Sequence, residues 1–134
     1  MTSFQIVALY VALNLILTPI LMFRVGQIRI KDNISLGDGD NPALLARIRA
    51  HANFTETAPI ALIGLIVLAM MNAHTIALHI FGAAFFIGRL AHAHGMAQKA
   101  ANGKGRIIGT LLTLGTFFGS AIYLLILVFT FNVT

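Results

Sequence analysis

The chain has 134 residues, of which 58% are hydrophobic and only 10% are charged, and it contains no Cys and no Trp. A soluble domain carries about 25% charged residues, so this composition argues against a water-soluble globule, and the high hydrophobicity excludes intrinsic disorder. The lack of Cys excludes disulfides, thiolate metal sites and a cysteine nucleophile. In so apolar a chain, the net charge of +5 is better explained by basic loops that set the orientation in a membrane than by nucleic-acid binding. We therefore expect no nucleic-acid partner.

Four stretches are long enough to cross a bilayer core of about 30 Å, which takes about 20 apolar residues of helix. We predict spans at residues 4–23, 42–71, 75–97 and 106–131. Because these spans and their short loops take up nearly the whole sequence, we expect one membrane domain over residues 1–134 with an all-α fold, a four-transmembrane-helix bundle. A signal peptide is the alternative for the first stretch, but it needs a basic region before the apolar run, and no Lys or Arg precedes Arg24.

The basic residues predict the orientation of the spans. Eight of the nine Lys and Arg residues flank the loops after the first and third spans, and the ninth is Arg89, inside the third span. The connection at residues 72–74 has none. By the positive-inside rule, the two basic loops are cytoplasmic and both termini lie outside the cytoplasm.

Two loops carry recognisable turn residues. The loop at residues 37–42 ends as a helix start, with Asp40 or Asn41 as the N-cap and Pro42 near the first helical position. A calcium loop of the EF-hand type would need Gly and Glu where Ala43 and Arg49 stand, so calcium is rejected. Residues 102–105 break the third and fourth spans with two glycines.

Polar residues inside the predicted spans are the most informative part of the sequence, because charges at membrane depth are costly and face the bundle interior or a wet cavity. In the second span, Arg49, Asn53 and Glu56 are spaced by four and three residues and share one helix face. In the third span, Arg89 and His92 share a face in the same way. Both groups belong to the cytoplasmic half of the membrane.

The simplest interpretation of these charges is an ion pair between Glu56 and Arg89 that fixes helix register. Such a pair does not explain why several other cationic and polar residues gather at the same membrane face, namely Arg29, Arg49, Asn53, His92 and Arg106. Together they predict a cationic pocket suited to a small molecule with more than one carboxylate, since Arg forks match carboxylates. No metal site is expected, because His92 and His94 do not share a helix face.

The fourth span carries a stripe of small residues, which lets membrane helices approach closely. Its members are Gly105, Gly109, Thr113 and Thr116 or Ser120.

The string Arg49-Ala50-His51-x-Asn53-x-x-Glu56-x-x-Pro59 resembles the signature of the MAPEG family, the membrane-associated proteins in eicosanoid and glutathione metabolism. The resemblance extends over the whole chain, from Gly26-Gln27-Ile28-Arg29 through Gly88-Arg89-x-x-His92 to Arg106 at the start of the fourth span. The short loops resemble the bacterial branch of the family, which implies a multi-pass protein of a bacterial inner membrane.

The resemblance implies a homotrimer of four-helix bundles, embedded in membrane lipid, that binds glutathione between subunits. By position, Arg49, Asn53 and Glu56 would hold the tripeptide and Arg29 would help to hold a carboxylate. Arg89 would pair with Glu56 or with a glutathione carboxylate, and His92 would support the site. Arg106 would be the catalytic residue, hydrogen-bonded to the sulfur, and the reaction would be conjugation of a small lipophilic electrophile or reduction of a peroxide.

The chain departs from the family pattern where many active members have Tyr, since Met96 stands one turn after His92 and residues 107–110 contain no Tyr. The alternative function is therefore a non-catalytic glutathione-binding or structural protein of the same fold. A small proton-coupled drug exporter also has four short spans, but it usually places its carboxylate in the first span, which here has none.

Overall fold

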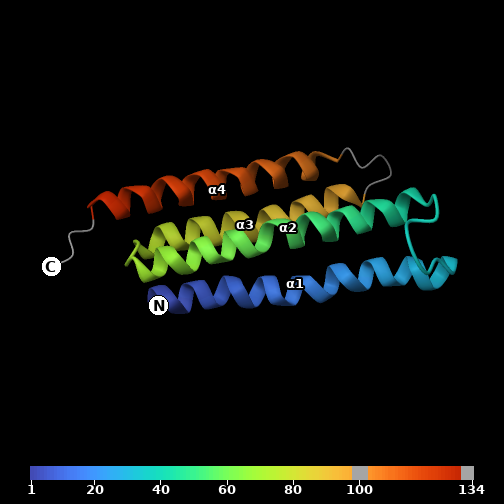
Figure 1. Ribbon diagram of the computed structural model, residues 1–134, viewed down its shortest axis with the longest axis horizontal. Helices are drawn as coiled ribbons and strands as arrows, with labels where there is room; N and C mark the ends of the chain where they lie inside the picture. The colour runs from blue at the N-terminus through green and yellow to red at the C-terminus, as the bar shows by residue number, and fades with distance from the viewer. Residues whose placement is uncertain (98–102, 131–134) are drawn as a thin grey trace.

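The computed structural model describes residues 1–97 and 103–130. It contains four long helices, α1 (Ser3–Asp32), α2 (Pro42–Met70), α3 (Thr75–Met96) and α4 (Lys104–Thr130). They form one elongated bundle in which α1 and α4 lie on opposite sides of the α2–α3 pair (Figure 1). Within the described ranges, α1 contacts α2 and α3 but not α4. All four helices are long and apolar enough to cross a membrane, so the predicted four-helix membrane bundle is confirmed.

The first helix is longer than predicted. It continues from the apolar span at residues 4–23 through a polar segment and ends only at Asp32. This segment contains Arg and Lys, which form helices readily, and hydropathy alone does not register such an extension. The helix stops because Asn33 adopts a left-handed conformation with φ of 52° and donates its backbone N–H to the carbonyl of Arg29.

The start of α2 confirms one of the two predicted caps. Asn41 is the N-cap, and its side chain accepts hydrogen bonds from the backbone N–H groups of Ala43 and Leu44. Pro42 occupies the first helical position, where its missing N–H costs nothing. The Asn41 Nδ2 also donates to Asp32 Oδ2 at 2.7 Å, so the cap ties the start of α2 to the end of α1.

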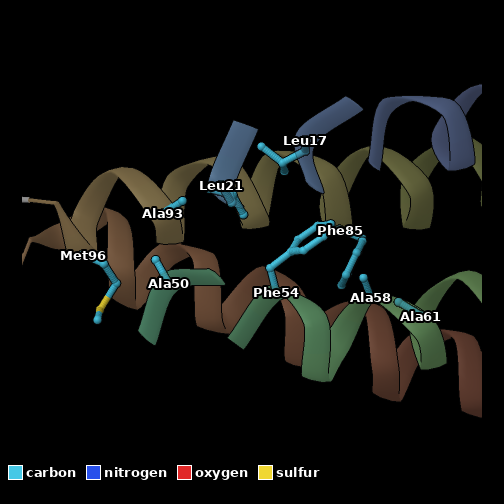
Figure 2. Packing of buried hydrophobic residues seen from close by; sticks show 9 residues of the cluster. All are labelled: Leu17, Leu21, Ala50, Phe54, Ala58, Ala61, Phe85, Ala93 and Met96. Atoms are coloured by element: carbon cyan, nitrogen blue, oxygen red, sulfur yellow. The ribbon is translucent and has the colours of Figure 1, made fainter. Parts of the chain in front are cut away.

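One of the two apolar clusters in the interior lies beside the candidate site. In Figure 2, Phe54 of α2 and Phe85 of α3 meet in its middle, with Leu17 and Leu21 of α1 on one side. The remaining members are mostly alanines, namely Ala50, Ala58, Ala61, Ala93 and, near the end of α3, Met96. Small side chains let the helix backbones approach, and in a membrane this van der Waals packing replaces the hydrophobic effect as the source of cohesion.

The closest helix contact is between α3 and α4, and glycine makes it possible. A Cβ atom at Gly109 would collide with the carbonyl oxygen of Gly88 and lie 2.6 Å from the Cβ of His92. At Gly105 it would lie 2.6 Å from the carbonyl oxygen of Ala91. The stripe predicted from the sequence is confirmed, since the buried residues of α4 are Gly109, Thr113, Thr116 and Ser120.

We expect Gly109→Ala to lower the free energy of unfolding by about 1–3 kcal/mol, the usual cost of overpacking. The added methyl group has to push α4 away from the backbone of α3. Thermal or chemical unfolding in detergent micelles measures the change. Gly115→Ala is the control, because a Cβ there meets nothing within 4 Å and Ala favours helix. Equal stability of the two variants would contradict the close contact.

Candidate functional site

The centre of the site is Arg89 of α3, which is only 2% exposed. Its Nη1 donates to Asn53 Oδ1 and, at 3.4 Å, to Thr57 Oγ1, both on α2. Its Nη2 donates to Thr113 Oγ1 and, at 3.1 Å, to the backbone carbonyl of Gly109, both on α4. One guanidinium group therefore links three helices.

The predicted ion pair between Arg89 and Glu56 is not present within the described chain. The four acceptors of the guanidinium are neutral, and Glu56 is exposed on α2. The prediction was wrong because facing oxygens of Asn53 and two threonines satisfy the fork of Arg89 without a carboxylate. The ring of Phe85, whose centroid lies 5.7 Å from Cζ of Arg89, adds a cation–π contact.

Arg89 also fixes the orientation of the amide group of Asn53. Because Arg89 donates to Oδ1 of Asn53, the amide oxygen is occupied. Among the described residues no acceptor is bonded to Nδ2 of Asn53, so this group can donate to a ligand. Asn53 is half-buried, so this group can reach a ligand at the surface of α2.

His92 and Arg106 extend this cluster toward the start of α4. His92 is buried, with 6% of its surface exposed, and it interacts electrostatically with both Arg89 and Arg106. Arg106 is exposed in the first turn of α4, where its backbone packs against Gly95 of α3. Four predicted site residues are thus brought together in a continuous group.

Arg106 also lines an open hollow of about 400 Å³ on the surface of α4. The other lining residues are Gly103, Ile107, Thr110 and Leu111. The hollow has a cation and a helix start at one end and aliphatic side chains at the other, so it suits a molecule with one anionic and one apolar part.

Three of the predicted ligand residues lie outside the cluster. Arg49 and Glu56 are exposed on α2, within one turn of Asn53 on either side. Arg29 is half-buried and donates to the backbone carbonyls of Ile34 and Ser35 at 3.3 and 3.4 Å, so it holds the loop that follows α1.

Sequence reasoning missed Thr57 and did not assign Thr113 to Arg89. Thr57 follows Asn53 by four residues and therefore lies on the same helix face. A buried Arg needs acceptors from facing helices, so the spacing could have indicated Thr57. No pattern in the sequence gives the register between α3 and α4 that places Thr113 beside Arg89.

Comparison with known proteins agrees with this architecture. The sequence model of the MAPEG family matches residues 7–126. The chain is 34% identical over 92 residues to the inner membrane protein YecN of Escherichia coli strain K12, covering 69% of this chain and 70% of that protein. YecN of Escherichia coli O6:H1 matches to the same extent. No solved structure matches the chain significantly. The family match covers nearly the whole bundle, and the chain belongs to the MAPEG family.

Proposed function

We propose that the protein binds glutathione in the cytoplasmic half of the membrane and activates its thiol for attack on a small lipophilic electrophile, as a transferase or peroxidase. The position of Arg106 carries the proposal. It presents a guanidinium at a helix start, beside a hollow with aliphatic walls and within electrostatic reach of His92. The family of the chain makes glutathione the ligand of choice.

The exposed face of α2 fits the polar groups of the tripeptide. Glutathione carries two carboxylates and an ammonium group. Arg49 would bind a carboxylate through its fork, Glu56 would face the ammonium group, and Nδ2 of Asn53 would donate to a carbonyl or carboxylate oxygen. Arg29 would hold the second carboxylate by turning away from its carbonyl partners.

Arg89 and His92 have a different role in this proposal. Both are buried, and the guanidinium of Arg89 already has four acceptors within the chain. They therefore act as positioning residues, Arg89 by fixing the amide of Asn53 and His92 by packing beside Arg106.

The chemistry rests on ionising a thiol. A free thiol has a pKa of about 8.5, and only the thiolate is a strong nucleophile. A guanidinium at Arg106 favours the charged form, and so does the positive dipole end of α4. An apolar electrophile would approach Arg106 from the lipid along the aliphatic part of the hollow.

A homotrimer would complete the site. Arg49, Glu56 and Arg106 are all exposed in the single chain, where water would screen their charges. Packing against a neighbouring subunit would exclude that water and strengthen each interaction. The relative YecN is described as an inner membrane protein, and we place this chain likewise in a bacterial inner membrane with its basic loops in the cytoplasm.

Direct binding tests the proposal. Isothermal titration of glutathione into detergent-purified protein should show saturable binding, and Arg49→Ala should weaken it about tenfold, the loss of one charge-assisted hydrogen bond. Lys31→Ala is the charge-matched control, because Lys31 is exposed at the end of α1. No heat of binding in the wild type, or equal binding by both variants, would refute the assignment.

One observation favours the alternative of a binding protein without turnover. Met96 is 8% exposed and packs in the apolar cluster with Ala50 and Ala93, so no hydroxyl group stands one turn after His92. A protein of this second kind would bind glutathione but leave its thiol pKa unchanged.

A further inference from the structure

A second group of arginines lies at the cytoplasmic end of the α1–α2 pair. Arg24 follows directly on the uncharged stretch of α1 at residues 4–23, and Arg47 lies in the second turn of α2. Nη1 of Arg47 donates to the backbone carbonyl of Arg24 at 2.7 Å and to Oε1 of Gln27 at 3.4 Å. These bonds hold the guanidinium of Arg47 close enough to that of Arg24 for the two charges to interact.

The two charges lack a counter-ion among the residues that the structure describes. Within residues 1–97 and 103–130, neither guanidinium forms an ion pair with a carboxylate, and that of Arg24 makes no hydrogen bond. Both side chains are half-buried, so water screens their repulsion less than it would at a fully exposed site. An anion shared between them would remove the repulsion and give both forks a partner.

The surroundings indicate which anion fits. Arg24 and Arg47 stand at the edge of a recess where α1, α2 and α3 converge, and its other walls are apolar. They are formed by Leu21, Ala46, Ala50, Ala93 and Ala97. The recess is too tight to enclose a soluble molecule. The recess offers two cations at the level where the apolar span ends, and the exposed apolar side chains of Ile20 and Phe23 on α1 precede Arg24.

We propose that Arg24 and Arg47 bind the phosphodiester group of an anionic membrane lipid. The phosphate would lie between the two guanidinium groups, and the beginning of the acyl chains would lie along the exposed apolar side chains of α1 that precede Arg24, such as Ile20 and Phe23. Neither arginine belongs to the proposed glutathione site, so the lipid proposal can be tested independently of the glutathione proposal. Arg24 at the end of the apolar span puts the pair at headgroup depth, which favours a lipid over a free anion.

The test uses Arg24→Gln, because the guanidinium of Arg24 makes no bond within the described chain. Detergent-purified protein is titrated with phosphatidylglycerol or phosphatidylcholine, and bound lipid is counted by native mass spectrometry while the melting temperature is recorded. The wild type should bind phosphatidylglycerol in preference and melt at a higher temperature with it. Arg24→Gln should bind that lipid about fivefold more weakly, in keeping with ~1 kcal/mol for a basic residue near an anionic surface.

The melting temperature of Arg24→Gln without anionic lipid separates a lipid-binding role of Arg24 from a structural one. Without anionic lipid, Arg24→Gln should melt at or above the wild-type temperature, because one of two repelling charges is gone. Lys104→Gln is the control, since Lys104 is exposed and its contribution should vanish in high salt. The proposal is overturned if Arg24→Gln and Lys104→Gln lose the same affinity in high salt, or if Arg24→Gln is destabilised without lipid. It is also overturned if inorganic phosphate at equal concentration raises the wild-type melting temperature as much as phosphatidylglycerol does.

Discussion

Replacing Arg89 by Ala is expected to lower the free energy of unfolding by about 2–5 kcal/mol, the range for truncating a large buried side chain. The substitution opens a cavity between α2, α3 and α4 and removes all four hydrogen bonds of the guanidinium. It also leaves the amide oxygen of Asn53 without its donor. Unfolding in detergent micelles, followed by circular dichroism, measures the loss.

Two further variants separate the causes. Arg89→Met also leaves the acceptors of the guanidinium without a donor, but it fills much of the cavity, so its loss should be smaller than that of Arg89→Ala. Lys104→Ala also removes one positive charge, but at an exposed position, and should change the free energy of unfolding by less than about 0.5 kcal/mol. If Arg89→Ala were as stable as Lys104→Ala, the hydrogen bonds of Arg89 to α2 and α4 would contribute nothing to stability.

The second large effect is expected at Arg106. Under the proposed function, Arg106→Ala should reduce the rate of conjugation at saturating glutathione by about 10- to 100-fold at neutral pH, because each unit of increase in the thiol pKa removes about tenfold of the thiolate. Binding of glutathione should change much less. A spectrophotometric assay with a generic chlorinated aromatic electrophile measures the rate.

The comparison with Arg49→Ala makes this prediction specific. Arg49 is assigned to an interaction that is equal in ground and transition states, so its loss should raise the glutathione requirement and leave the saturated rate nearly intact. Arg106→Lys keeps a positive charge and should recover part of the rate. The assignment fails if Arg106→Ala reacts at the wild-type rate, or if Arg49 and Arg106 variants show the same kinetic pattern.

The sequence predicted the fold well because the membrane simplifies the problem. A span must be a helix in which every backbone group is satisfied, so apolar length located α3 and the end of α2 to within one residue, and the capping residues before Pro42 located the start of α2. Apolar length could not locate the end of α1, since the segment up to Asp32 is polar and hydropathy does not register a helix outside the bilayer. The cap at Asn33 depends on a left-handed backbone conformation that Gly, Asn and Asp residues can all adopt.

The candidate site was predictable only in part. Helix periodicity places Arg49, Asn53 and Glu56 on one face of α2, but only Asn53 belongs to the cluster around Arg89. Periodicity does not specify how one helix is rotated relative to its neighbour. For that reason the predicted contact between Arg89 and Glu56 was wrong. The partners of Arg89 follow from the close approach of α3 to α4 at Gly109, which depends on three-dimensional packing and not on spacing along the chain.

Under the proposed function, this bundle lowers the pKa of the bound glutathione thiol. The direct measurement is a pH titration of glutathione in the presence of excess purified protein, following the ultraviolet absorbance of the thiolate. We expect a titration midpoint at least one unit below that of free glutathione, equivalent to ~1.4 kcal/mol of thiolate stabilisation. A midpoint equal to that of the free tripeptide, with binding demonstrated in the same sample, would contradict it.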